Sequence, residues 1–347
     1  MTNTERANCS VDVHAHAIPP RLIDRAASGA FSGVDLDSGD GAIRFQFPRM
    51  DTAPPAPVSL TDFESMATWA AGRGVDLQLL GPWTDLLGYT LDEVDARKWT
   101  RVYNESLVDE CSSRSGMVPV ATIPMSYPAA ALDELVAARE MGCRGVMIGT
   151  DIPDLHLGSP ELDPVWAVAA DLGMPIIVHP TFLRVPKELH EAGLKNAVGR
   201  AGPTAVALTK LIYSGALVRH RDLVVVGCHG GGALAAVTAR ILRNHEVGWS
   251  GSEYDPSESI DRLFFDSVVL DPTYLAYLVK LYGSERILLG SDHPFPWEPD
   301  PIRVVDEAGL TDTDRAQIVG GNAQRLFGPD LCRREGSGSD AAPSAGR

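Results

Sequence analysis

The sequence predicts an α/β fold, specifically a (β/α)8 TIM barrel with a small insertion after its first strand. Short apolar, β-branched runs alternate with longer segments of helical period, which is typical of parallel βαβ units. Eight such runs fall within residues 1–330, which favours one closed barrel over an open doubly wound sheet. Histidines directly follow several of these runs, as expected where strand ends meet at one barrel mouth.

The eight predicted strands would form the barrel wall. They are residues 11–13, 75–80, 118–123, 145–148, 175–178, 223–226, 263–265 and 287–289. Each is followed by a helix or by a connection long enough to hold one. The clearest helical patterns are residues 62–71, 93–111, 129–140, 162–171, 205–214, 234–244 and 312–326.

Two segments depart from this alternation. Residues from about 29 to 59 are irregular and rich in Gly, Asp and Pro, and we expect them to form an insertion over the barrel mouth. Within them, the alternating residues 43–47 predict a hairpin strand. Residues 331–347 end in a Gly-, Ser- and Ala-rich stretch and are predicted to be a disordered tail.

Composition excludes several classes of function. The formal net charge of −16 disfavours binding to nucleic acid or to anionic membranes. The sequence has neither a long apolar run nor signal-peptide features at its start, so we expect a cytoplasmic protein. Its five cysteines are odd in number and show no CxxC spacing, which argues against a disulfide framework or a cysteine-rich zinc site.

Histidines carry the main functional signal. Five of the nine follow the end of a predicted strand, where the active sites of (β/α)8 barrels lie. These five are His14, His16, His179, His229 and His293.

Four residues form a candidate metal site. His14 and His16 are two residues apart, so a strand would direct both imidazoles to one face. His179 and Asp292 each follow a buried strand. Three imidazoles and a carboxylate suit one divalent ion, Zn²⁺ first, with Mn²⁺, Fe or Co also possible. The alternatives are core histidines bonded to backbone, and an Asp292 that caps a helix or forms a salt bridge.

His229 begins the sequence His-Gly-Gly-Gly, in which glycines would allow close approach of a ligand. It could act as general acid/base on a water held by the metal. The alternative is a structural histidine before a flexible turn. His293 could bind substrate, but its position also fits a packing residue or a neighbour of the ligands.

Several longer motifs resemble the amidohydrolase superfamily (amidohydrolase-related family 2). They are VDVHAHAIP (11–19), GVDLQLL (74–80), LLGYTLDE (86–93), IIVHP (176–180), SGAL (214–217), HGGG (229–232), IDRLFFDS (260–267) and ILLGSDHPFP (287–296). They cover nearly the whole chain in family order. The branch they resemble contains 2-amino-3-carboxymuconate 6-semialdehyde decarboxylase.

The resemblance implies roles for particular residues. His14, His16, His179 and Asp292 would hold the metal, and His229 and Asp292 would be catalytic. Arg49 and Arg240 would bind substrate carboxylates, with Arg240 reaching across a homodimer interface. Phe295 would line the substrate pocket.

Three departures leave the substrate open. The connection after Pro180 lacks a tryptophan of the decarboxylase, His293 replaces a tyrosine, and the insertion aligns poorly. The resemblance nevertheless implies non-oxidative decarboxylation of a small unsaturated or aromatic carboxylate. The alternatives are amide or lactone hydrolysis, cyclodehydration in a biosynthetic pathway, and a barrel that binds a ligand without catalysis.

Overall fold

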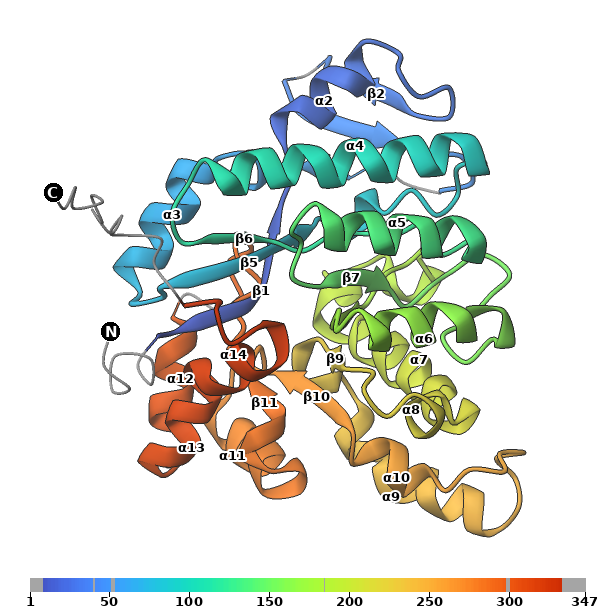
Figure 1. Ribbon diagram of the computed structural model, residues 1–347, viewed down its shortest axis with the longest axis vertical. Helices are drawn as coiled ribbons and strands as arrows, with labels where there is room; N and C mark the ends of the chain where they lie inside the picture. The colour runs from blue at the N-terminus through green and yellow to red at the C-terminus, as the bar shows by residue number, and fades with distance from the viewer. Residues whose placement is uncertain (1–8, 40, 51–53, 184, 298–299, 333–347) are drawn as a thin grey trace, which may run out of the picture.

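The computed structural model describes residues 9–39, 41–50, 54–183, 185–297 and 300–332 (Figure 1). Eight parallel strands form its centre. They are β1 (Val11–Ala17), β5 (Leu77–Pro82), β6 (Met117–Pro119), β7 (Val146–Gly149), β8 (Ile176–His179), β9 (Val225–Gly227), β10 (Leu263–Asp266) and β11 (Ile287–Leu288). They pair in the order β1-β5-β6 and β7-β8-β9-β10-β11.

Two junctions close these sheets into a barrel. A parallel bridge between Ala121 and Val146 joins the end of β6 to β7. On the other side, Ala15 bridges His293, and the Val13 amide donates to the Leu289 carbonyl at 2.9 Å. The predicted (β/α)8 barrel is therefore confirmed, and its closure places β1 directly beside β11.

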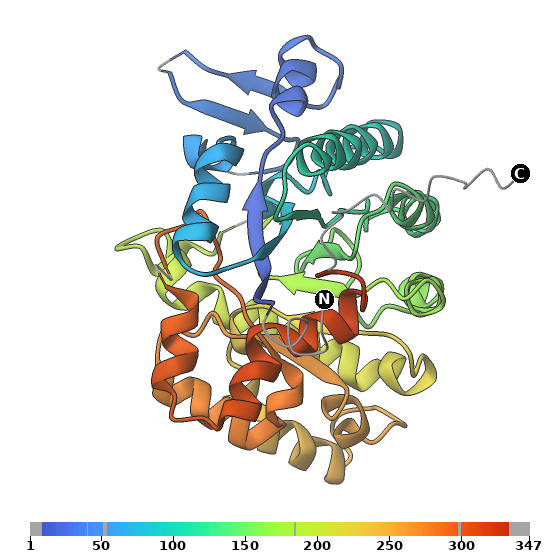
Figure 2. The same ribbon diagram turned by 60° about the vertical axis from the view of Figure 1, so that its left-hand side comes forward.

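Helices surround the strands (Figures 1 and 2). The main ones are α3 (Phe63–Gly72), α4 (Glu93–Ser112), α5 (Pro128–Glu140), α6 (Asp163–Asp171), α7 (Ala201–Ser214), α9 (Leu234–Glu246) and α11 (Pro272–Tyr282). The shorter ones are α8 (Ala216–Arg219), α10 (Pro256–Ile260), α12 (Pro301–Glu307), α13 (Asp312–Ala316) and α14 (Asn322–Phe327). Aspartates cap several of them, as where the Asp92 side chain accepts from the Asp95 amide at the start of α4. Where one helix was expected at 312–326, the structure has three consecutive segments, which are α13, a π-helical turn and α14.

The insertion after β1 is more regular than expected. It follows α2 (Pro20–Ala27) and contains three antiparallel strands, β2 (Asp35–Asp37), β3 (Ile43–Gln46) and β4 (Pro55–Ala56). Phe31, Phe45 and Phe47 pack their rings edge-on around Trp99 of α4 at centroid distances of 5.0, 5.8 and 5.1 Å. This aromatic cluster fixes the insertion against the barrel, at the end where β1 stops.

The two ends of the described chain meet in a disulfide. Cys9 precedes β1, and Cys332 follows α14 and bonds to it across 323 residues of sequence. Cysteine number and spacing argued against a disulfide framework and did not predict this single bond, because they carry no information on such distant partners. Of the tail predicted from residue 331, Leu331 is buried and Cys332 is bonded, and residues 333–347 lie outside the described residues. Residues 1–8, where a signal peptide was not expected, are also outside them.

None of the described helices is long and apolar enough to cross a membrane.

Candidate metal centre

His14 and His16 project from β1 into the barrel, and both are fully buried. The Nδ1 atom of His14 lies 2.6 Å from Oδ2 of Asp266, and that of His16 lies 2.8 Å from the Pro82 carbonyl oxygen. An ionised carboxylate and a carbonyl can only accept hydrogen bonds, so both Nδ1 atoms carry the ring hydrogen. Each Nε2 atom therefore has a free lone pair when its ring is neutral.

These lone pairs converge. The two Nε2 atoms are 3.1 Å apart, and Oδ1 of Asp292 lies 3.3 Å from that of His14 and 3.1 Å from that of His16. In the neutral imidazoles no hydrogen is available between these three acceptors. Three buried acceptor atoms in contact repel one another unless a cation lies among them.

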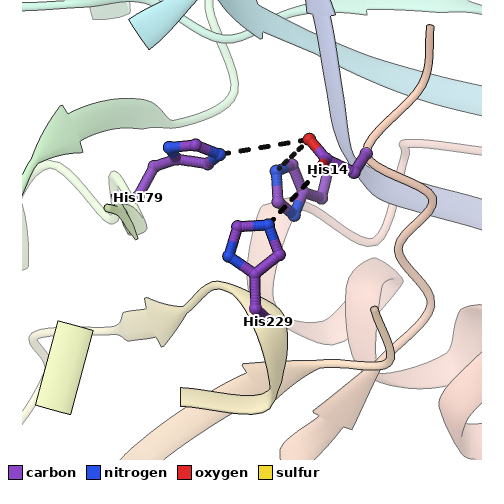
Figure 3. Close-up of side chains that lie close together, drawn as sticks. His14, His179 and His229 are labelled. Carbon is purple, nitrogen blue, oxygen red and sulfur yellow. Dashed lines mark hydrogen bonds and ion pairs between the residues drawn. The ribbon is translucent and has the colours of Figure 1, made fainter. Parts of the chain in front are cut away.

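His179, the last residue of β8, completes the group. Its Nδ1 atom lies 3.0 Å from the Pro180 carbonyl oxygen, so this ring also carries its hydrogen on Nδ1. Its Nε2 atom is buried, lacks a hydrogen-bond partner among the described residues, and lies 4.0 Å from Oδ1 of Asp292. Figure 3 shows His179, His14 and His229 turning their rings toward one another.

The charge states fit a metal site. Burial raises the pKa of Asp292, but the surrounding histidines outweigh it and hold that pKa well below its usual range. Burial, with the neighbouring histidines, lowers the pKa of His179 well below its usual range, and burial also lowers that of His16. His14 differs: burial lowers its pKa, but Cys228, Asp292 and Asp266 outweigh burial and hold that pKa well above its usual range, so this ring is protonated when no other cation is present. A divalent ion such as Zn²⁺ or Mn²⁺ can take the place of that proton among the imidazole nitrogens and the ionised carboxylate.

His229 approaches the cluster from the end of β9. Its Nε2 atom lies 3.4 Å from Oδ2 of Asp292, so the two oxygens of this carboxylate face different histidines. Its side chain is 20% exposed, against 0% for His14 and 4% for His179, and its Nδ1 atom has no partner among the described residues. Both His229 and Asp292 adopt left-handed backbone conformations, with φ of 55° and 59°. Such strain is frequent at functional sites.

The three glycines after His229 serve packing. A Cβ atom on Gly230 would lie 2.6 Å from Val269, one on Gly231 2.7 Å from Phe265, and one on Gly232 2.5 Å from the Ala201 carbonyl. All three also have positive φ. Glycine is therefore required here by close packing against Val269, Phe265 and Ala201, and close approach of a ligand stays a prediction.

The remaining predicted site residues lie in different parts of the structure, and one of them lies beside the cluster. Phe295 lies beside the cluster, its ring centroid 5.7 Å from that of His16. His293 instead stacks on Trp69 of α3 at 4.1 Å, and burial lowers its pKa to about 4. Arg240 lies on the exposed face of α9, and none of the described residues forms an ion pair with it.

Arg49 lines a cavity of about 560 Å³ between the insertion and the loops after β5, β6 and β7. Its walls include Tyr89, Asp92, Tyr127 and Asp154. Neither the metal-centre histidines nor Asp292 lines this cavity.

Two buried carboxylates of the site had no role assigned from sequence. Asp266 fixes His14 and accepts the amides of Gly230 and Val268 at 3.0 and 3.1 Å. Asp12 accepts from the His14 amide at 3.1 Å and from the Ser291 hydroxyl at 2.5 Å, which ties β1 to the segment that carries Asp292. Asp266 ends a buried apolar strand as Asp292 follows one, and that signal could have identified it.

The amidohydrolase family model matches residues 11–328 of this chain. The 2-amino-3-carboxymuconate-6-semialdehyde decarboxylase of Dictyostelium discoideum is 27% identical over 268 residues, 74% of this chain and 74% of that protein. The gamma-resorcylate decarboxylase of Rhodococcus jostii is 27% identical over 251 residues, 65% of this chain and 74% of that protein.

Solved structures share the fold. The 5-carboxyvanillate decarboxylase of Sphingomonas paucimobilis has a TM-score of 0.76 at 21% identity and covers 92% of this chain and 99% of its own. The enzyme of the same name from Novosphingobium aromaticivorans, complexed with manganese and 4-hydroxy-3-methoxy-5-nitrobenzoic acid, has a TM-score of 0.77 at 19% identity, covering 94% and 97%.

Proposed function

This chain belongs to the amidohydrolase family, and from that premise we propose that it is a metal-dependent, non-oxidative decarboxylase of a small unsaturated or aromatic carboxylate. The observation that carries the proposal is the convergence of three imidazole Nε2 atoms on Oδ1 of Asp292. Relatives named as decarboxylases of carboxylated muconate and resorcylate support the choice of reaction.

His14, His16, His179 and Asp292 would hold one divalent ion. We propose Zn²⁺, with Mn²⁺ as the alternative that the manganese-bound relative supports. When bound, the ion supplies a positive charge that stabilises the electrons left behind as CO2 departs. The Nε2 atoms of these histidines would be available to bind the ion because each Nδ1 hydrogen is already bonded to a carboxylate or carbonyl oxygen.

His229 would move the proton. Loss of CO2 breaks a carbon–carbon bond, and the electron pair stays on the substrate carbon, where a proton must replace the carboxyl group. His229 suits this step because it is the most exposed histidine of the cluster and its Nε2 faces Oδ2 of Asp292. Asp292 thereby contributes to catalysis by holding this ring as well as the ion.

Phe295 would line the substrate pocket beside His16. Arg49 and Arg240 would bind substrate carboxylates through two parallel hydrogen bonds each. Arg240 lies on an exposed helix face, so the proposal places it in the neighbouring active site of a homodimer. We also propose a cytoplasmic location. The Cys9–Cys332 disulfide argues against it, because disulfides are rare in cytoplasmic proteins.

The test is a CO2-release assay of the purified protein over a panel of aromatic and unsaturated carboxylates, run as purified, after chelation, and after addition of Zn²⁺ or Mn²⁺. We expect CO2 release from at least one carboxylate, lost on chelation and restored by one of the ions. Amides, lactones and ortho-hydroxyanilides are included in the panel. Hydrolysis or cyclisation of these, with no CO2 from any carboxylate, would contradict the proposed reaction.

A further inference from the structure

Arg200 stands where the loop after β8 enters α7. It directly follows a π-helical turn formed by Lys195–Gly199. Its Nη1 donates to the Pro180 carbonyl at 3.0 Å, and its Nε donates to the side-chain oxygen of Asn196 at 2.9 Å. The guanidinium is therefore held in one orientation by two neutral acceptors.

The Pro180 carbonyl is also the acceptor for His179. The Nδ1 atom of His179 lies 3.0 Å from it, so this one oxygen receives a hydrogen bond from each residue. A carbonyl oxygen has two lone pairs, and these two donors use both. The bond to Pro180 keeps the His179 hydrogen on Nδ1 and leaves Nε2 free to bind a cation. Whatever fixes the Pro180 carbonyl therefore fixes the orientation of the His179 ring.

The backbone beside Arg200 is attached to the opposite side of the cluster. The Ala201 carbonyl accepts the Ala233 amide at 3.1 Å, directly after the glycines that follow His229. Gly232 packs so closely that a Cβ atom there would lie 2.5 Å from the Ala201 carbonyl oxygen. Arg200 thus joins the segment that carries His179 to the one that carries His229.

No carboxylate of the described residues pairs with Arg200, so its hydrogen bonds to Pro180 and Asn196 are not part of an ordinary salt bridge. In contrast, Arg219 later in the same region pairs with Asp163 at 2.6 Å. An arginine that donates to the backbone carbonyl beside a metal-ligand residue can orient that residue.

We propose that Arg200 is a positioning residue of the metal centre, which holds the Pro180 carbonyl so that His179 presents its Nε2 to the ion. This inference rests on the proposed metal centre. It adds to that centre a residue that touches neither the ion nor the substrate but acts through one peptide carbonyl.

The test compares Arg200→Met, Arg200→Lys and Asn196→Ala with wild type and with Lys210→Met. Lys210 is an exposed cation of the same helix, so its variant controls for loss of positive charge. Metal affinity is measured by competition with a chelating indicator, and the visible spectrum of the Co²⁺-substituted protein reports the ligand geometry. kcat and KM are measured on any substrate found.

We expect Arg200→Met to bind Zn²⁺ about 10- to 100-fold more weakly than wild type, as is usual when an outer partner of a metal ligand is removed. Its Co²⁺ spectrum should change. Arg200→Lys should recover part of the affinity, because lysine restores one charged donor. Asn196→Ala, an exposed position that should not disturb folding, should weaken binding in the same direction but less. Lys210→Met should match wild type.

Unchanged metal affinity and Co²⁺ spectrum in both Arg200→Met and Asn196→Ala would overturn the inference, even if KM rose, because Arg200 would then contact substrate or merely support the loop. Should Arg200→Met fail to fold, Asn196→Ala and Arg200→Lys decide alone. Wild-type protein that binds no metal would instead remove the metal centre itself, and the inference with it.

Discussion

The Nε2 atoms of His14 and His16 lie 3.1 Å from each other, although each ring already donates its hydrogen through Nδ1. Two lone pairs at this distance are unfavourable without a positive charge between them. The adjacent Oδ1 of Asp292 makes the need for a cation greater, because it adds a third acceptor. The barrel therefore folds into a preformed site for a positive ion.

The first prediction concerns metal content. Asp292→Ala and His179→Ala should each lose the divalent ion, because each removes one of four ligands. Inductively coupled plasma mass spectrometry of the purified proteins measures this. Wild type should carry about one ion per chain. His245→Ala is the control, since the His245 ring on α9 bonds to Ser250 at 3.1 Å and to none of the candidate ligands in the described part of the chain, and this variant should keep the metal. Full metal content in the Asp292 variant would contradict the assignment.

The second prediction concerns Asp266, which should act through His14. In Asp266→Asn the amide nitrogen can replace Oδ2, because Oδ1 is already held by the Gly230 and Val268 amides. The amide would donate to His14 Nδ1, moving the ring hydrogen to Nε2 and blocking the ligand atom. We expect metal affinity to fall about 10- to 100-fold, measured by chelator competition. An affinity equal to wild type would mean that His14 needs no such partner.

The third prediction separates His229 from the ligands. His229→Asn should lower kcat by about 10²- to 10⁴-fold, the usual contribution of a general acid/base, and should leave metal content near wild type. Steady-state CO2 release and metal analysis are run on the same preparation. If activity and metal are lost together, His229 is a ligand instead, which its 3.4 Å distance to Asp292 would also permit.

The fourth prediction concerns the cysteines. Burial raises the pKa of the Cys143 thiol to about 12, and raises those of Cys111 and Cys228 as well. At pH 8 these thiols stay protonated and enclosed, so the native protein should react slowly with a thiol reagent. Denaturation without reductant should expose three thiols, and reduction should expose all five.

The same disulfide should stabilise the fold. It closes the whole barrel, with partners separated by 323 residues, and so restricts the unfolded chain. Cys9→Ser should lower the free energy of unfolding by about 2–5 kcal/mol, measured by urea denaturation. Cys111→Ser cannot serve as its control because that thiol is buried, so reduced wild type is the proper comparison. Five thiols in unreduced, denatured protein would show that the bond does not form.

Much of the fold was predictable because its signals are local. Each barrel strand is a short apolar run, and the main helices have a helical period, with aspartate caps at the start of α3, α4 and α11, so neighbouring residues suffice to identify them. The insertion was predicted less well. Its short strands become stable by packing on Trp99, a residue of a distant helix, and no local pattern reveals that contact.

Sequence alone identifies the residue types that end the strands: two histidines on β1, one on β8, one after β9 and an aspartate after β11. How these side chains meet depends on the folded barrel. Closure of β1 against β11 brings Asp292 to His16 across 276 residues of sequence, and Asp266, Pro82 and Pro180 set which nitrogen each ring offers. Closure likewise pairs Cys9 with Cys332. The residue type at each strand end can be read from the local sequence. The distances between the site atoms and the protonation of the histidine rings depend on contacts between segments that meet only when the barrel closes.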